Sequence, residues 1–121
     1  MTGFIERTQW QGFLDDFSKR NQLRPTRLEV IGPEVGLQEE EKYLPLIGVS
    51  FEPKGSESGS VEITLGGETI NDPRYVTHLV GHVERITPLI GTRSPEEGLG
   101  IEDQEGGKTL LRFDVLPELH A

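Results

Sequence analysis

The first part of the chain carries apolar residues at the spacing of one face of an amphipathic helix, i, i+3, i+4 and i+7. The residues on this face are Trp10, Phe13, Leu14 and Phe17. Thr8 followed by Gln11 matches a capping box, in which each side chain bonds a free backbone N–H at the start of a helix. Pro25 prevents the helix from continuing. We therefore predict one helix over residues 8–21, with its aromatic face buried.

After Pro25 the hydrophobic period changes to two, which is typical of half-buried β-strands. Apolar and polar residues alternate in 27–31, 47–51, 61–65, 99–101 and 111–115. A loop rich in serine and glycine, 53–59, separates the second and third of these segments and predicts a hairpin. The charged run 39–42 predicts a solvated turn or edge, because runs of charge normally stay hydrated.

Residues 76–90 fit two descriptions. Leu79, Val83 and Ile86 match a helical stripe, whereas the many β-branched residues favour a strand. Gly81 also disfavours a helix. We predict extended structure, best defined over 82–87, and the helical alternative for 76–86 stays open.

These elements predict an α+β fold of one domain over residues 1–121. The N-terminal helix packs on a five- or six-stranded antiparallel sheet that occupies about residues 26–116. A sheet of this size must protect its edges and its apolar face. We therefore expect a strongly curved sheet or a small, partly open barrel covered by the helix, with a frayed tail over 117–121.

Composition narrows the possible functions of the 121 residues. The absence of cysteine excludes disulfides, thiolate metal sites and cysteine nucleophiles. The 12 basic and 21 acidic residues give a net charge of -9, which repels nucleic acid and anionic lipid. The charge therefore argues against nucleic acid and membranes as partners.

Two further features of the sequence concern location. No apolar run approaches the 18 or so residues that a membrane span needs. The segment Met1–Glu6 lacks the basic and apolar regions of a secretory signal. We expect a soluble, cytoplasmic protein.

Four stretches resemble a family of short, uncharacterised bacterial proteins described as a domain of unknown function. They are Trp10–Asn21, Arg24–Val30, Leu44–Phe51 and Gly107–Phe113. The resemblance spans most of the chain and implies a stand-alone bacterial domain. It implies no catalytic residue, binding residue or cofactor.

His78, His82 and Glu84 form the most suggestive group of metal-ligand side chains. On a strand they share one face, although residues 78 and 82 then lie about 13 Å apart, too far to share one ion easily. On a helix the two histidines match the spacing of a zinc hydrolase motif, but Leu79 stands where its glutamate base is required. A metal site or small enzyme built on these three residues is therefore an alternative hypothesis.

Lys19, Arg20, Arg24 and Arg27 form a basic patch at the end of the predicted helix. Such a patch is able to bind an acidic partner, a phosphate or, as a second alternative, nucleic acid. The chain's own glutamates are the favoured partners, because acidic residues dominate the rest of the sequence.

The sequence contains no phosphate-binding glycine loop and no nucleophile motif. We therefore expect a non-enzymatic binding or regulatory domain without catalytic residues or a cofactor. Its expected partner is another protein or a second copy of itself.

Overall fold

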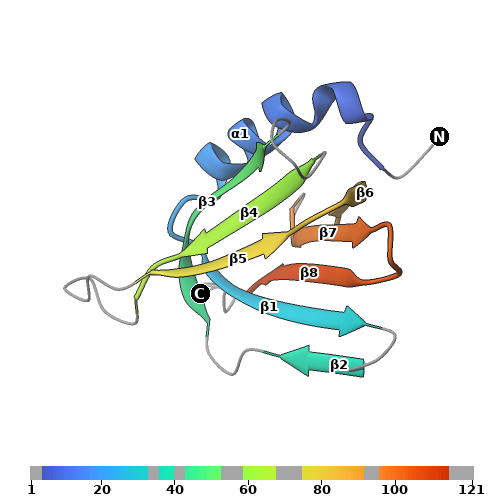
Figure 1. Ribbon diagram of the computed structural model, residues 1–121. Helices are drawn as coiled ribbons and strands as arrows, with labels where there is room; N and C mark the ends of the chain where they lie inside the picture. The colour runs from blue at the N-terminus through green and yellow to red at the C-terminus, as the bar shows by residue number, and fades with distance from the viewer. Residues whose placement is uncertain are drawn as a thin grey trace.

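The N-terminal segment with the aromatic residues forms an α-helix, the one that the described residues contain. In the computed structural model, which describes residues 4–32, 36–39, 43–52, 59–67, 75–91 and 96–114, a short 3-10 turn leads into this helix. The elements in chain order are the 3-10 turn Arg7–Gln9, α1 Trp10–Arg20, β1 Pro25–Gly32, β2 Gly36–Glu39, β3 Leu44–Glu52, β4 Ser60–Leu65, β5 Val76–Val80, β6 Val83–Leu89, β7 Gly98–Asp103 and β8 Lys108–Phe113 (Figure 1).

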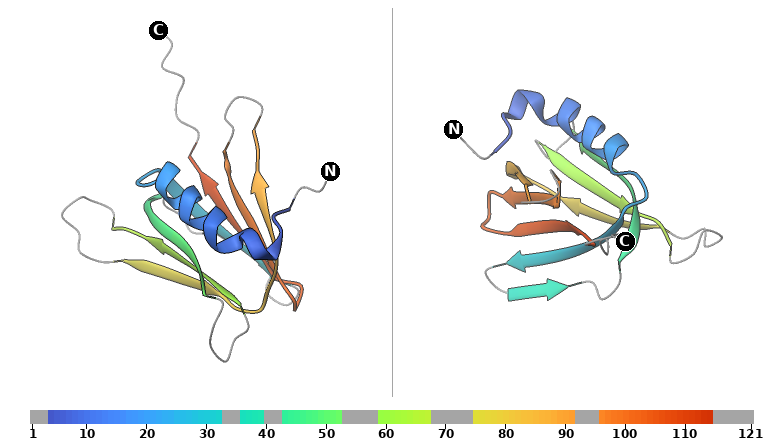
Figure 2. Two further views of the ribbon diagram at one scale, coloured as in Figure 1. Left: turned by 90° about the horizontal axis from the view of Figure 1, so that it is seen from above. Right: turned by 180° about the vertical axis from the view of Figure 1, so that it is seen from behind.

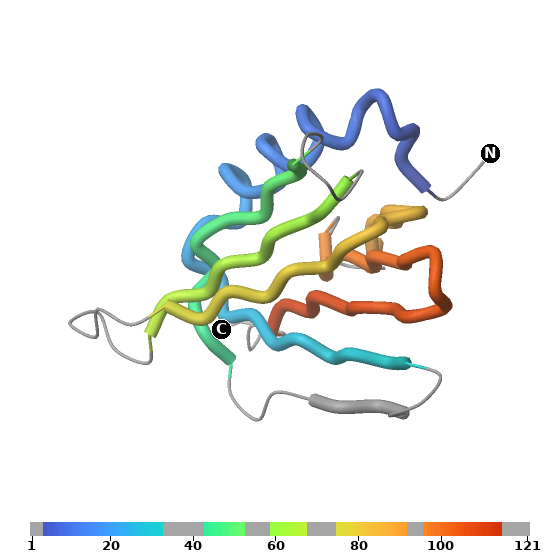
Figure 3. The backbone as a smooth tube through the Cα atoms, in the orientation of Figure 1, coloured from blue at the N-terminus to red at the C-terminus, as the bar shows by residue number. Residues whose placement is uncertain are grey.

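The strands form one antiparallel sheet whose continuous path runs β5-β4-β3-β1-β8-β7-β6, with β2 paired to β1. The strands at the two ends of this path, β5 and β6, are not paired with each other. Only Gly81 and His82 lie between them, so the backbone passes directly from one end of the sheet to the other (Figure 3). The sheet therefore curls round without closing into a barrel.

The sheet bends at β3, which changes partner along its length. Pro45 and Leu44 pair with the start of β1, whereas residues 46–52 pair with β4. As a result β3, β4 and β5 form one half of the molecule, and β1, β2, β6, β7 and β8 form the other. Figure 2 shows α1 lying along the opening between the two halves.

The core fills the space that α1 and the two halves of the sheet enclose. Leu14 and Phe17 of α1 are fully buried, and the Trp10 ring packs edge-on against Phe51 of β3. Phe17 also stacks on Phe113 of β8, with ring centroids 5.7 Å apart. The helix thus contacts both halves of the sheet, as the spacing of its aromatic residues predicts.

The α+β class and the N-terminal helix are confirmed, but the predicted count of five or six strands is wrong. The described residues form eight strands, because β2 is an additional short strand and 76–90 forms two strands rather than one. Glu39, expected in a solvated turn or edge, is the last residue of β2. The sequence of β2, Gly36–Glu39, lacks the alternation of apolar and polar residues that would predict a strand.

The start of the helix also differs from the prediction. Thr8 lies inside the 3-10 turn, and Gln9 precedes α1 without a side-chain hydrogen bond, so the expected capping box does not form. The hairpin between 47–51 and 61–65 is confirmed by the pairing of β3 with β4. The expected loop 53–58, Val115 and the tail 117–121 lie outside the described residues.

Candidate functional site

The outer edge of β5 is an uncharged strand edge with large exposed side chains. Tyr75, Val76 and Leu79 are exposed over 65%, 40% and 58% of their surfaces, whereas Val80 is buried. In the described part of the chain, β5 pairs with β4 on one side and with no strand on the other. Apolar side chains beside an unpaired strand edge are features that other proteins use for strand pairing.

The direction of the backbone N–H and C=O groups alternates along each strand, and this alternation defines which groups point toward the outer edge of β5. Both backbone groups of Val49 bond to Ser18 and therefore point away from β4. In an antiparallel ladder the direction of these groups alternates from residue to residue and across each pair. Ile63 lies opposite Val49, so its groups point toward β5. His78, which pairs with Ile63, therefore points its N–H and C=O toward β4.

Thr77 and Leu79 flank His78, so their N–H and C=O groups point the opposite way, toward the free edge. Both side chains are exposed. The edge thus offers two residues whose backbone donors and acceptors are available to a further strand. The pairing of β5 with β4 does not use these groups.

Chain segments other than strands cover two comparable edges. The amide of Ile5 donates to the carbonyl of Ile86 on β6 at 2.8 Å, so the N-terminal segment lies along that edge. On β3, the hydroxyl of Ser18 bonds both backbone groups of Val49. The outer edge of β5 differs from both, because no backbone bond to it is found among the described residues.

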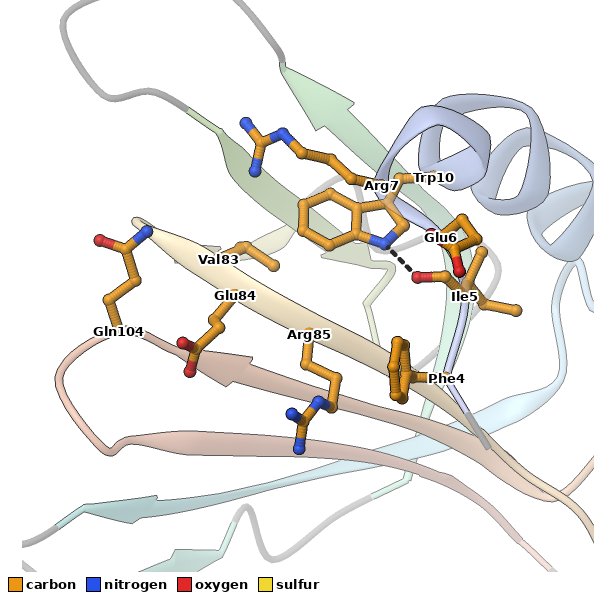
Figure 4. A pocket seen from close by; sticks show the side chains of 9 residues that line it. All are labelled: Phe4, Ile5, Glu6, Arg7, Trp10, Val83, Glu84, Arg85 and Gln104. Carbon is orange, nitrogen blue, oxygen red and sulfur yellow. Dashed lines mark hydrogen bonds between the residues drawn. The ribbon is translucent and has the colours of Figure 1, made fainter. Parts of the chain in front are cut away.

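A second candidate is a cavity of about 290 Å³ between the start of α1 and β6. Its lining residues are Phe4, Ile5, Glu6, Arg7, Trp10, Val83, Glu84, Arg85 and Gln104. The indole N–H of Trp10 donates to the carbonyl of Ile5 at 2.9 Å and holds the N-terminal segment against the helix (Figure 4). The cavity lies at the lower end of the size range of small-molecule pockets.

Both acidic and basic side chains line this cavity, and both of its arginines contact aromatic rings. The Arg7 guanidinium stacks over the Trp10 ring at 5.0 Å, and the Arg85 guanidinium stacks over Phe4 at the same distance. Arg85 also lies 3.7 Å from Glu102. Since two glutamates balance the two arginines of the lining, the cavity shows no preference for an anion or a cation.

The structure does not gather the suggested metal ligands into one site. His78 lies on the inward face of β5, with Nε2 at 3.5 Å from the hydroxyl of Thr109 on β8. His82 occupies the bend between β5 and β6 with a φ of 50°, and Glu84 lines the cavity beside Trp10. Among the described residues, no group of three or more His, Asp or Glu side chains is placed to hold a metal ion.

The residues of the basic patch contact different acidic partners, Glu96 for Arg20 and Arg24 and Glu29 for Arg27. The Arg20 guanidinium makes two hydrogen bonds to the Glu96 carboxylate, at 3.0 and 2.8 Å. Arg24 donates to the Glu96 carbonyl at 3.1 Å and stacks over Phe113, with its guanidinium carbon 4.1 Å from the ring centroid. Arg27 lies instead on β1 and pairs with Glu29 at 3.4 Å. Lys19 is exposed at the end of α1.

Glu96 is the centre of this cluster, which joins the end of α1 to the start of the β7 segment. The hydrogen bond from Arg20 lowers the pKa of Glu96 against the opposing effect of partial burial, and Asn21 adds a second hydrogen bond in the same direction. The same contact raises the pKa of Arg20. Arg20 and Glu96 are 76 residues apart in sequence, so local patterns could not have identified this pair.

Sequence reasoning did not identify the β5 edge as a candidate site. The signal that could have identified it is the run Tyr75–Val80, which holds several large apolar residues and no Asp, Glu, Lys or Arg. Uncharged side chains do not protect an edge strand against pairing. The pattern does not show, however, that β5 lies at the end of the sheet.

Comparisons with known proteins add a family and one curated relative. A model of a family of unknown function matches residues 1–120. An uncharacterised protein of the bacterium Aquifex aeolicus is 40% identical over 53 residues, which are 44% of this chain and 48% of the relative. The match therefore spans about half the length of that relative. No solved structure matches the chain significantly. Within the described residues, no helix combines the length and the apolar character needed to cross a membrane.

Proposed function

Since the chain belongs to DUF5335, a family of unknown function, we propose a role from the geometry: a non-enzymatic binding domain that recognises an extended strand at β5. The observation that carries this proposal is the outer edge of β5, to which no other strand of the described residues is paired. There the backbone groups of Thr77 and Leu79 lie beside the exposed side chains of Tyr75 and Val76.

Strand addition supplies both affinity and selectivity at such an edge. Main-chain hydrogen bonds to Thr77 and Leu79 bind the added strand, and alternate side chains of that strand contact the two faces of the sheet. The edge needs no rearrangement, because β4 already holds β5 in an extended conformation. Binding therefore orders only the incoming segment.

A first experiment measures amide exchange by NMR in dilute protein. We expect the amides of Thr77 and Leu79 to exchange rapidly, because they face the open edge, and that of His78 to exchange slowly, because it bonds β4. Equal protection of all three amides would show that the edge is already occupied, and would contradict the proposal.

A second experiment adds a synthetic probe peptide of alternating valine and threonine, with a lysine at each end. We expect the amides of Thr77 and Leu79 to shift and become protected. The matched control is the same peptide with N-methyl groups on alternate residues, which removes the backbone donors of one edge. If both peptides cause equal shifts, or if the shifts concentrate around Trp10, strand addition at β5 is not the binding mode.

A further inference from the structure

Building on the proposed role of β5, we infer that its free edge binds the same edge of a second copy of the chain. The two β5 strands pair antiparallel about a two-fold axis that passes beside His78. This symmetric arrangement joins identical surfaces and closes after two copies, as in most homodimers.

The directions in which the backbone N–H and C=O groups of β5 point fit this register. In a pairing centred on His78, Thr77 lies opposite Leu79 of the second copy, and Leu79 lies opposite Thr77 of the second copy. Both residues point their backbone groups toward the free edge, so each of these pairs exchanges both of its backbone hydrogen bonds. The two His78 residues form the intervening pair without hydrogen bonds, since their own groups face β4.

Charge also permits this register, although each copy carries a net charge of -9. The strand Val76–Val80 contains no Asp, Glu, Lys or Arg. Glu62 on β4 is the cross-strand neighbour of Leu79, and Thr64 is the neighbour of Thr77. In the paired sheet each of the two rows that contain Thr77 and Leu79 therefore holds one glutamate and no opposing carboxylate. The closest approach of two acidic copies occurs where neither is charged.

The same register covers exposed apolar surface. Val76, which is 40% exposed, lies opposite the buried Val80 of the second copy. The two Leu79 side chains occupy the same face as diagonal neighbours, at a distance where long side chains still touch. Because only five residues of each strand pair, the interface is smaller than the standard of about 1,600 Å². We therefore expect weak association.

Sedimentation equilibrium of the full chain tests the inference. The weight-average mass should rise from monomer toward dimer as the protein concentration approaches about 1 mM. Added salt should strengthen the dimer, because it screens the repulsion between two acidic copies. If the edge instead bound a basic partner, added salt would weaken that binding.

Two variants locate the interface. Thr77→Pro removes an edge-facing N–H without disturbing the ladder to β4, and should leave the protein monomeric. Thr77→Val keeps that N–H and should dimerise like the wild type. As a second variant, Thr77→Glu keeps the backbone N–H and lies beside the uncharged Thr64 of its own sheet, and should weaken dimerisation at least about tenfold by adding like charge across the two-fold axis.

The outcomes separate this inference from the proposed function. A wild type that stays monomeric at every concentration and salt level overturns self-pairing. Rapid exchange of the Thr77 and Leu79 amides would in that case still support strand recognition at β5. A Thr77→Pro variant that dimerises as strongly as the wild type would place the interface elsewhere and also overturn the inference.

Discussion

Ser18 on α1 satisfies both backbone groups of Val49 on β3. Its hydroxyl accepts a hydrogen bond from the Val49 N–H and donates to the Val49 carbonyl, each at 2.9 Å. The Ser18 Oγ also lies 2.8 Å from the Leu14 carbonyl oxygen, so the two carbonyls share its one proton. One side chain of the helix thus replaces a neighbouring strand at this edge.

Replacing Ser18 with alanine should therefore destabilise the protein. Ser18→Ala leaves the N–H and C=O of the buried residue Val49 without partners, and each unsatisfied group costs about 1–3 kcal/mol. We expect a lower midpoint of urea unfolding with an unchanged slope. Lys19→Ala, at the exposed neighbouring position, should have little effect. Equal midpoints for the two variants would contradict the role of Ser18.

Gly98 should tolerate no side chain. Its φ is 155°, and a Cβ at this position would overlap the carbonyl oxygen of Leu111 on β8. We expect Gly98→Ala to reduce the free energy of unfolding by about 2–3 kcal/mol, because the backbone of β7 or β8 must shift.

The matched control is Gly12→Ala on α1, where no atom lies within 4 Å of an added Cβ. This change should stabilise the protein by up to about 1 kcal/mol, because alanine is the better helix former. Thermal unfolding of both variants measures the contrast. A Gly98→Ala protein as stable as the wild type would show that the two strands separate easily.

The Arg20–Glu96 pair should make stability depend on pH. The pKa of Glu96 is lowered in the folded state, relative to about 4.3 in the unfolded chain. The stability that ionised Glu96 contributes is therefore fully present above pH 4.3, and it is lost as the pH falls through the lower pKa of the folded state. Since Arg20 is about half exposed, the effect should stay below about 1 kcal/mol.

Urea unfolding of the wild type and Glu96→Gln over this pH range measures that contribution. The difference between the two proteins should be largest near neutral pH and should shrink on acidification. A difference that stays constant to the lowest pH would mean that the glutamine variant loses packing rather than charge.

Trp10→Phe should loosen the N-terminal segment more than the core. The change removes the indole donor and leaves the Ile5 carbonyl without its side-chain partner. We expect the Ile5 amide, which bonds Ile86 on β6, to exchange faster than the amides of β4. Uniform acceleration throughout the sheet would instead indicate a general loss of stability.

The sequence predicts the elements whose pattern is local and regular. The aromatic spacing of α1 and the alternation in β3 and β4 each reflect one buried face, whereas β7 is buried on both faces at residues 98–101. The bend between β5 and β6 has no such signal, because similar β-branched residues lie on both sides of it. There His82 takes a positive φ, which few residues other than glycine adopt.

The candidate site depends even more on tertiary arrangement. The exposure of Leu79 follows from the position of β5 at the end of the sheet. The pairing of Arg20 with Glu96 follows from a fold that brings distant segments together. Residue types alone suggest a basic patch and a group of metal ligands. The structure separates His78 from Glu84, and it joins Arg20 to Glu96, one of the chain's own glutamates, which are the partners that the sequence favours.

The position of β8 imposes an order on folding during synthesis. This last strand lies between β1 and β7, so it joins the earliest strand of the chain to one of the latest (Figure 1). Thr26 pairs with Phe113, so residues separated by most of the chain must come together. Until the ribosome releases β8, the facing edges of β1 and β7 have no partner. Nascent chains therefore carry two open edges that the finished protein does not expose, and they are most prone to aggregate in that interval.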